Sequence, residues 1–179
     1  MRISLTVLAL AAALCAPALA QSTPAPAPAN YPNGGTPEQA PFVTPYGPPI
    51  TADRAQRVAA AVMAEAAKHP SWQFNIAVVD PNGDLVYFYR MPNAQIASTT
   101  IAINKAYTAA RFRRETRVFY NAMEGGHPYV ATLDPRLTAS PGGIPLVENG
   151  HIIGAVGCSG GTGDMDWTVC TAGAASLGR

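Results

Sequence analysis

The sequence has no excess of charge of either sign. Its 12 Lys and Arg residues stand against 11 Asp and Glu residues, and charged residues make up only 13% of the chain. Proteins that bind nucleic acids or membrane surfaces usually carry a clear basic excess. We therefore expect no nucleic-acid partner. The one basic cluster, residues 111–117, is interpreted as the solvated end of a helix, where cations meet the negative end of the dipole.

The fingerprints of the large enzyme classes are also missing. The sequence contains no phosphate-binding P-loop, no GxSxG nucleophile elbow, and no CxxC or HExxH metal-binding spacing. After residue 20 no apolar run is long enough to span a bilayer, so we expect no membrane span. These absences leave a small binding protein, or an enzyme without a common motif, as the open classes.

The first 50 residues differ from the rest of the chain. Residues 1–20 combine Arg2, an apolar stretch and the small-residue pattern Ala18-Leu19-Ala20, and they predict a cleaved signal peptide and a periplasmic or secreted protein. Cys15 suggests a lipoprotein, but the bulky Leu14 before it favours the soluble form. Residues 21–50 are rich in Pro and Ala and predict an extended leader. The folded domain is expected at residues 51–179.

Cysteine is scarce in the expected mature chain, where only Cys158 and Cys170 remain. An exported protein meets an oxidising compartment, so these two residues are candidates for a disulfide worth about 3 kcal/mol at best. Two buried free thiols are a comparable alternative, because cysteine behaves as a small apolar residue in cores.

The periodicity of apolar residues predicts an α+β domain. It indicates a helix beginning after Thr51, a hairpin at residues 74–90, a helix from about Gln95 to Arg114 and a shorter one at 116–123. A short strand is expected at 129–133. Asn149-Gly150 supplies the tight turn of a second hairpin, and Asp164 is the expected N-cap of a last helix. This order predicts an antiparallel sheet covered by helices.

Two features of this pattern suggest a ligand. A glycine-rich loop joins the second hairpin to the last helix, and the amides of Ser159, Gly160 and Gly161 can bind an anion there. The alternative is that these glycines only allow a turn. Lys105 lies on an otherwise small, apolar helical stripe, so it either extends along its stem to water or lines a pocket.

Several motifs occur in order along residues 51–179. They are Val78-Val79-Asp80 with Asn82-Gly83, Arg90-Met91, Lys105-Ala106 with Thr108-Ala109, Gly142-Gly143-Ile144-Pro145, and residues 153–161. Together they resemble the GlcG/HbpS-type haem-binding family, to which the C-terminal domain of PduO-type corrinoid adenosyltransferases belongs. The resemblance implies a profilin-like antiparallel sheet of about five strands flanked by helices, and a homo-oligomer. Some members of the family bind haem and others degrade it or bind iron, so haem or a related tetrapyrrole is the leading candidate cofactor.

A haem site needs an axial ligand for iron and polar groups for the propionates. Among the histidines, His69 follows a helix and His151 follows the Asn149-Gly150 turn, so both are expected at the surface. His127 lies in a loop beside Tyr129 and is the candidate metal ligand, although a structural loop histidine is the alternative.

The candidate partners for the propionates are Arg90, Lys105 and the amides of the glycine-rich loop at Ser159, Gly160 and Gly161. Two other functions stay open. The same cations and loop suit an enzyme acting on a small organic acid, with Asp80 or Asp164 as general base. An oligomeric assembly protein without a ligand is the third.

Overall fold

The two predicted hairpins form the centre of the fold. The computed structural model describes residues 44–178, so the predicted signal peptide and most of the leader lie outside the described residues. Strands β1 (Asn75–Val79) and β2 (Leu85–Arg90) form the first hairpin, and β3 (Gly143–Glu148) and β4 (His151–Ser159) form the second. All neighbouring strands are antiparallel, in the order β2-β1-β4-β3. The α+β fold is therefore confirmed, with four strands where the resemblance implied about five.

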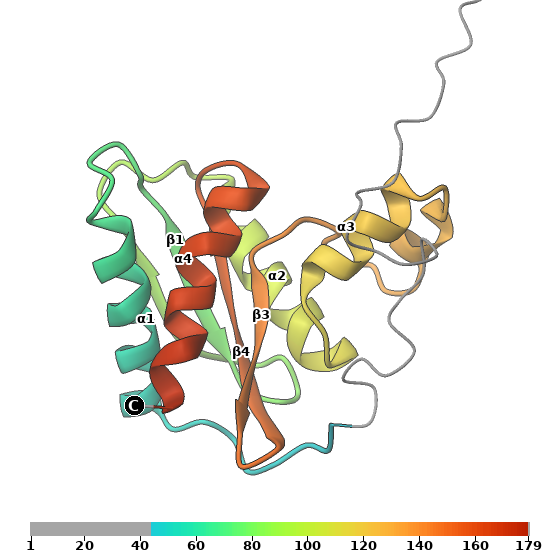
Figure 1. Ribbon diagram of the computed structural model, residues 1–179, viewed down its shortest axis with the longest axis horizontal. Helices are drawn as coiled ribbons and strands as arrows, with labels where there is room; N and C mark the ends of the chain where they lie inside the picture. Colours follow the sequence, from blue (N-terminus) through green and yellow to red (C-terminus); the bar gives the residue numbers. More distant parts are fainter. Residues whose placement is uncertain (1–43, 179) are drawn as a thin grey trace, which may run out of the picture.

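Helices cover both faces of this sheet (Figure 1). Helices α1 (Ala52–Ala66) and α4 (Gly163–Ala175) pack against each other and against one face, while α2 (Ser98–Phe112) packs on the other. The face under α1 and α4 carries large apolar side chains, including Phe74, Ile76 and Val156. The layer under α2 is made mainly of alanines. The small side chains let α2 lie close to the sheet.

The approach of α2 to the sheet is close enough to require glycine. A Cβ atom on Gly157 in β4 would lie 2.1 Å from the carbonyl oxygen of Ala102, and one on Gly143 in β3 would lie 2.4 Å from that of Lys105. Both values are far below van der Waals contact, so the helix backbone rests directly on the strands. This contact places the middle of α2, including Lys105, directly over β3 and β4.

A smaller unit projects on the side away from α1 (Figure 1). It consists of α3 (Thr116–Glu124), the 3₁₀ helix η3 (Pro128–Thr132) and Leu133, and we call it the α3–η3 lobe. Thr116 fastens it to the sheet: its buried hydroxyl donates to the carbonyl of Ser140 at 2.6 Å and accepts from the amide of Gly143 at 2.9 Å. The lobe is thus held at its first residue by partners in the segment leading into β3.

Two local predictions were wrong. The strand expected at residues 129–133 is the helix η3, because Pro128 at its start fixes φ and cannot donate to a ladder. The N-cap of α4 is Thr162, whose hydroxyl accepts from the amide of Met165, and Asp164 lies within the first turn. A carboxylate in that turn is still favourable to the helix dipole. A last 3₁₀ helix, η4 (Ser176–Gly178), follows α4.

The described part of the chain contains no helix that is both long and apolar enough to cross a membrane.

Candidate functional site

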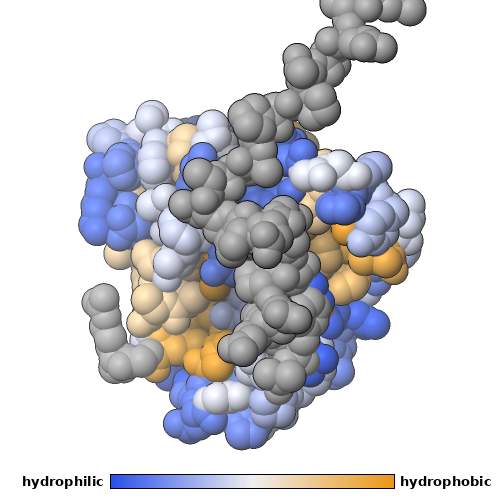
Figure 2. Space-filling view, turned by 45° about the vertical axis from the view of Figure 1, so that its right-hand side comes forward, coloured by the Kyte–Doolittle hydropathy of each residue, from blue (hydrophilic) through white to orange (hydrophobic). Residues whose placement is uncertain are grey.

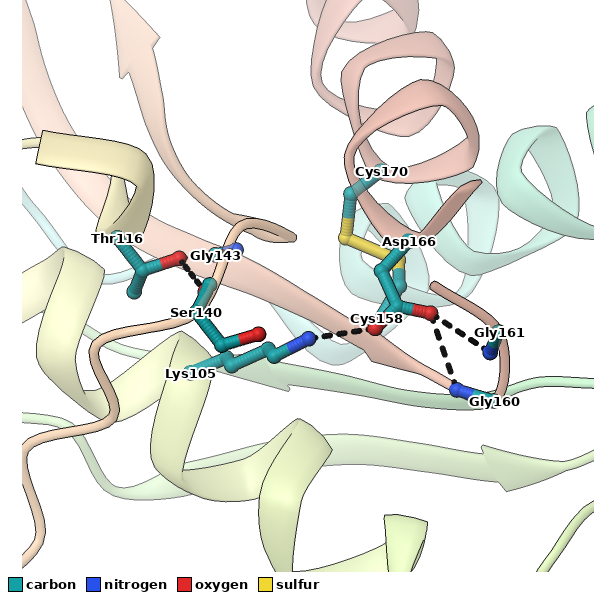
Figure 3. Close-up of a disulfide and its surroundings, with 9 residues drawn as sticks. All are labelled: Lys105, Thr116, Ser140, Gly143, Cys158, Gly160, Gly161, Asp166 and Cys170. Carbon is teal, nitrogen blue, oxygen red and sulfur yellow. Dashed lines mark hydrogen bonds and ion pairs between the residues drawn. A yellow bond between two sulfur atoms is a disulfide. The ribbon is translucent and has the colours of Figure 1, made fainter. Parts of the chain in front are cut away.

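A buried ion pair lies where the glycine-rich loop meets α2. The ammonium of Lys105 donates to Oδ2 of Asp166 at 2.5 Å, and the two side chains are only 1% and 4% exposed. Lys105 comes from the middle of α2 and Asp166 from the first turn of α4 (Figure 3). Lys105 therefore neither extends to water nor lines an open pocket.

The second oxygen of the same carboxylate binds the glycine-rich loop. Oδ1 of Asp166 accepts hydrogen bonds from the amides of Gly160 at 3.1 Å and Gly161 at 3.0 Å (Figure 3). The loop amides thus bind a carboxylate, but this carboxylate belongs to the chain itself and not to a ligand. Burial is the main influence on both charges: it raises the pKa of Asp166 and lowers the pKa of Lys105, while their mutual attraction acts in the opposite sense.

A disulfide closes this junction. Cys158, near the end of β4, is bonded to Cys170 in α4, with their Cα atoms 5.7 Å apart and both side chains fully buried. The bond settles the choice between a disulfide and two free thiols. We call this region, with Lys105, Asp166, the disulfide and the loop between its cysteines, the glycine-loop junction. Its parts tie β4, α2 and α4 to one another.

The remaining predicted partners lie in different places. Ser159 is buried, and its hydroxyl donates to that of Ser98 at the start of α2, at 3.1 Å. Arg90 is exposed at the end of β2, in register with Asn75, which is itself in register with Ser159. Two strand spacings separate Arg90 from Ser159, or about 10 Å. Arg90 therefore lies outside the glycine-loop junction.

His127 lies in the α3–η3 lobe and not at the junction. It connects α3 to η3 and is exposed, and its ring meets the edge of Tyr129 with the ring centres 6.0 Å apart. Among the described residues, its imidazole nitrogens make no hydrogen bond. The predicted haem set is thus divided: the structure brings Lys105 together with Gly160 and Gly161, and it places His127 and Arg90 elsewhere.

The other polar candidates have structural contacts. Asp80 accepts from the amides of Asn82 and Asp84 and so holds the turn between β1 and β2. Asp164 pairs with Arg117 at 2.7 Å and is 83% exposed. The ring of His151 is hydrogen-bonded to the carbonyl of Asn149 at the exposed hairpin tip, as predicted.

The third histidine, His69, is exposed at the turn that follows α1. Its ring stacks on Trp72 with the ring centres 3.8 Å apart. Its predicted place at the surface is confirmed.

Sequence reasoning missed Asp166. The available signal was a second aspartate in the first turn after the glycine-rich loop, where a side chain can reach back to amides of its own loop. The local pattern points instead to Asp164, which lies nearer the loop. The pairing with Lys105 joins residues 61 positions apart and has no local signature.

The hollows of this surface are shallow. One of about 470 Å³ lies between the described end of the leader and the β1–β2 turn, lined by residues that include Tyr46, Asn82 and Arg111. The described residues contain no cluster of three or more His, Cys, Asp or Glu side chains placed to hold a metal ion.

Comparison with known proteins gives a consistent result. The family described as "Haem degrading protein HbpS-like" matches residues 50–175. Protein GlcG of Escherichia coli is 40% identical over 107 residues, which are 58% of this chain and 79% of GlcG.

Solved structures share the fold. A double mutant of Streptomyces reticuli HbpS superposes with a TM-score of 0.68 and 27% identity, covering 85% of this chain and 100% of HbpS. The structure titled a PduOC:Heme complex has a TM-score of 0.66 at 23% identity, covering 72% of this chain and 94% of PduOC, and this likeness concerns the fold alone. With the family match extending over nearly all of the described residues, the chain belongs to the HbpS-like family.

Proposed function

We propose that the protein binds haem or a closely related tetrapyrrole on the α3–η3 lobe, with His127 as the axial ligand of iron. The observation that carries this proposal is membership of a family described as haem-degrading. A protein of the same fold has been solved as a haem complex, which adds support. Binding must precede any degradation, so the proposal is limited to binding.

The lobe exposes large apolar side chains at its surface. Tyr129 is 62% exposed and Leu133 is 53% exposed, and Tyr120 and Met123 are also exposed large apolar side chains. Figure 2 shows apolar areas between hydrophilic ones on the face that is turned forward there. Exposed apolar patches next to a free ligand-forming side chain are typical of binding surfaces. An imidazole is the commonest axial ligand of haem iron.

The glycine-loop junction is a weaker candidate for a ligand. Asp166 already occupies the amides of Gly160 and Gly161 and the ammonium of Lys105. A substrate carboxylate would have to displace the buried carboxylate of Asp166, which is fixed in the first turn of α4 directly after the loop. The geometry therefore gives no support to an enzyme that clamps a small organic acid there.

Export and self-association belong to the same proposal. The Cys158–Cys170 disulfide supports a periplasmic or secreted location, because such bonds persist in oxidising compartments. Strand β2 is an edge of the four-stranded sheet, which supports a homo-oligomer in which copies cover open edges. Sedimentation of the mature protein with and without haemin would separate a ligand-free assembly protein from a haem-dependent one.

The test of haem binding is an absorbance titration of the mature protein with haemin. We expect a Soret shift that saturates at one haem per subunit and is lost in His127→Ala. The matched controls are His69→Ala and His151→Ala, which remove the other two exposed imidazoles and should leave the shift unchanged. A shift that never saturates in the wild type, or one that survives in His127→Ala, contradicts the proposal.

A further inference from the structure

Two arginine side chains lie against one aromatic ring, that of Tyr107 on α2. The guanidinium carbon of Arg136 lies 3.8 Å from the ring centre, and that of Arg111 lies 5.1 Å from it. Its hydroxyl donates to Asp134 at 3.0 Å, which fixes the ring. Arg136 also donates from Nε to the side chain of Asn104 at 3.2 Å. The two guanidinium groups are thus held in place although both residues are exposed.

These two cations have no carboxylate partner among the described residues. The ion pairs there involve Arg54, Lys68, Lys105 and Arg117 as the cations. The carboxylate of Asp134 instead accepts from the Tyr107 hydroxyl and from the backbone amide of Arg136. Among the described residues, the one carboxylate beside this ring faces two guanidinium groups, so the cluster keeps a net positive charge that attracts a further anion. A guanidinium in a fixed position binds a carboxylate with two parallel hydrogen bonds.

Arg136 follows His127 in the chain, and the groups between them are of the kinds that a haem contacts. Between the two residues lie the five residues of η3, which rise about 2 Å each or about 10 Å in all, and then Leu133, Asp134 and Pro135. The order along the chain is therefore an imidazole, exposed apolar side chains and then a cation held over Tyr107. Haem has the same order, with iron at its centre, an apolar ring around it and two propionates at one edge.

We propose that Arg136, assisted by Arg111, binds the propionates of a haem whose iron is bound by His127. This proposal rests on haem binding at the lobe and names its polar anchor. It replaces the assignment of Arg90 and Lys105, because Lys105 is paired with Asp166 and Arg90 lies at the end of β2. The site selects a porphyrin with free carboxylates over one without them.

The test compares haemin with haemin dimethyl ester, in which both propionates are masked. Each is titrated into the wild type, Arg136→Gln, Arg90→Gln and the matched control Arg57→Gln, which removes an exposed guanidinium on α1. We expect Arg136→Gln to weaken haemin binding about fivefold, the usual limit for an exposed charge pair, and to leave the affinity for the ester unchanged. Arg111→Gln should have the same selectivity with a smaller effect, and Arg57→Gln should change neither ligand.

The outcomes separate the two proposals. A wild type without a saturable Soret shift overturns haem binding and the anchor together. A wild type that saturates, with Arg136→Gln binding haemin as tightly or losing both ligands equally, overturns only the anchor. Weakening by Arg90→Gln in place of Arg136→Gln would restore the sequence-based assignment. Arg136→Lys keeps the charge but loses the two parallel hydrogen bonds, so its haemin affinity should lie between those of the wild type and Arg136→Gln. Unchanged binding of the ester in both variants excludes a general loss of structure.

Discussion

The glycine-loop junction and the α3–η3 lobe both carry groups typical of ligand sites, and they use them in opposite ways. At the junction the buried carboxylate of Asp166 accepts from the buried ammonium of Lys105 and from two backbone amides of the glycine-rich loop. On the lobe the imidazole of His127 lies at the surface without a hydrogen bond among the described residues, and the nearby guanidinium groups of Arg111 and Arg136 have no carboxylate partner there. Buried polar groups must be paired within the fold, whereas exposed ones are free to bind something else.

The largest expected effect is at the junction. Asp166→Asn keeps an oxygen for the glycine amides but leaves the Lys105 ammonium buried without a counter-charge. We expect it to lower the free energy of unfolding by about 3–5 kcal/mol, measured by urea denaturation with the disulfide intact. Asp164→Asn, a change at a surface aspartate two residues away, should stay within about 0.5 kcal/mol.

A double variant tests whether the lost stability comes from the unpaired charge of Lys105. The double variant Lys105→Met/Asp166→Asn removes both charges and should recover part of the loss, because apolar replacement of a buried ion pair is often neutral or better. A single variant as stable as the wild type would show that the pair does not hold the junction together.

Removing the disulfide should have the next largest effect. The bond joins cysteines 12 positions apart, and a loop of this size is worth about 3 kcal/mol or less. Cys158→Ala/Cys170→Ala should therefore unfold at lower urea concentration while its haemin titration stays that of the wild type. If the double variant loses haem binding while still folded, the two regions are not independent.

A smaller effect is expected where the lobe joins the sheet. Thr116→Val leaves the amide of Gly143 and the carbonyl of Ser140 without their hydrogen-bond partner, which should cost about 1–2 kcal/mol. Thr132→Val is the matched control, because its hydroxyl donates to Tyr129 at an exposed position. Equal losses in the two variants would mean that Thr116 is no anchor.

The smallest effect on stability, and a clear one on binding, is expected on the lobe itself. Tyr129 is 62% exposed, so Tyr129→Ser should change the free energy of unfolding by less than about 0.5 kcal/mol. It should nevertheless weaken haemin binding, since it removes apolar surface next to His127. Val147→Ser, at an exposed apolar position on β3, should leave the titration unchanged. Equal haemin affinity in Tyr129→Ser and the wild type would remove Tyr129 from the site.

The sequence was informative where the determinants are local. The Asn149-Gly150 turn has positive φ at both residues, and Lys105, the cation noted on a helical stripe, is buried in the fold. The region after His127 was misread because apolar residues suggested a strand, while Pro128 begins a 3₁₀ helix. The apolar pattern of the residues after Pro128 does not show that this proline favours a helical turn over a strand.

The candidate site was less predictable because its parts come from distant segments. Lys105 and the glycine-rich loop were both singled out, yet the group that joins them, Asp166, was not. His127 and Lys105 belong to different units of the fold, which no local spacing reveals. The placement of Arg136 over Tyr107 depends on how the segment after η3 returns to α2, and this too has no signature in the sequence.

The disulfide has a consequence for how the molecule refolds. The chain between Cys158 and Cys170 contains both glycine amides and the carboxylate that accepts from them. In an unfolded chain that stays oxidised, this covalent ring keeps donor and acceptor at high effective concentration. Only Lys105, 61 residues from Asp166, must then be found by diffusion. The oxidised chain should therefore rebuild the junction faster than the reduced one.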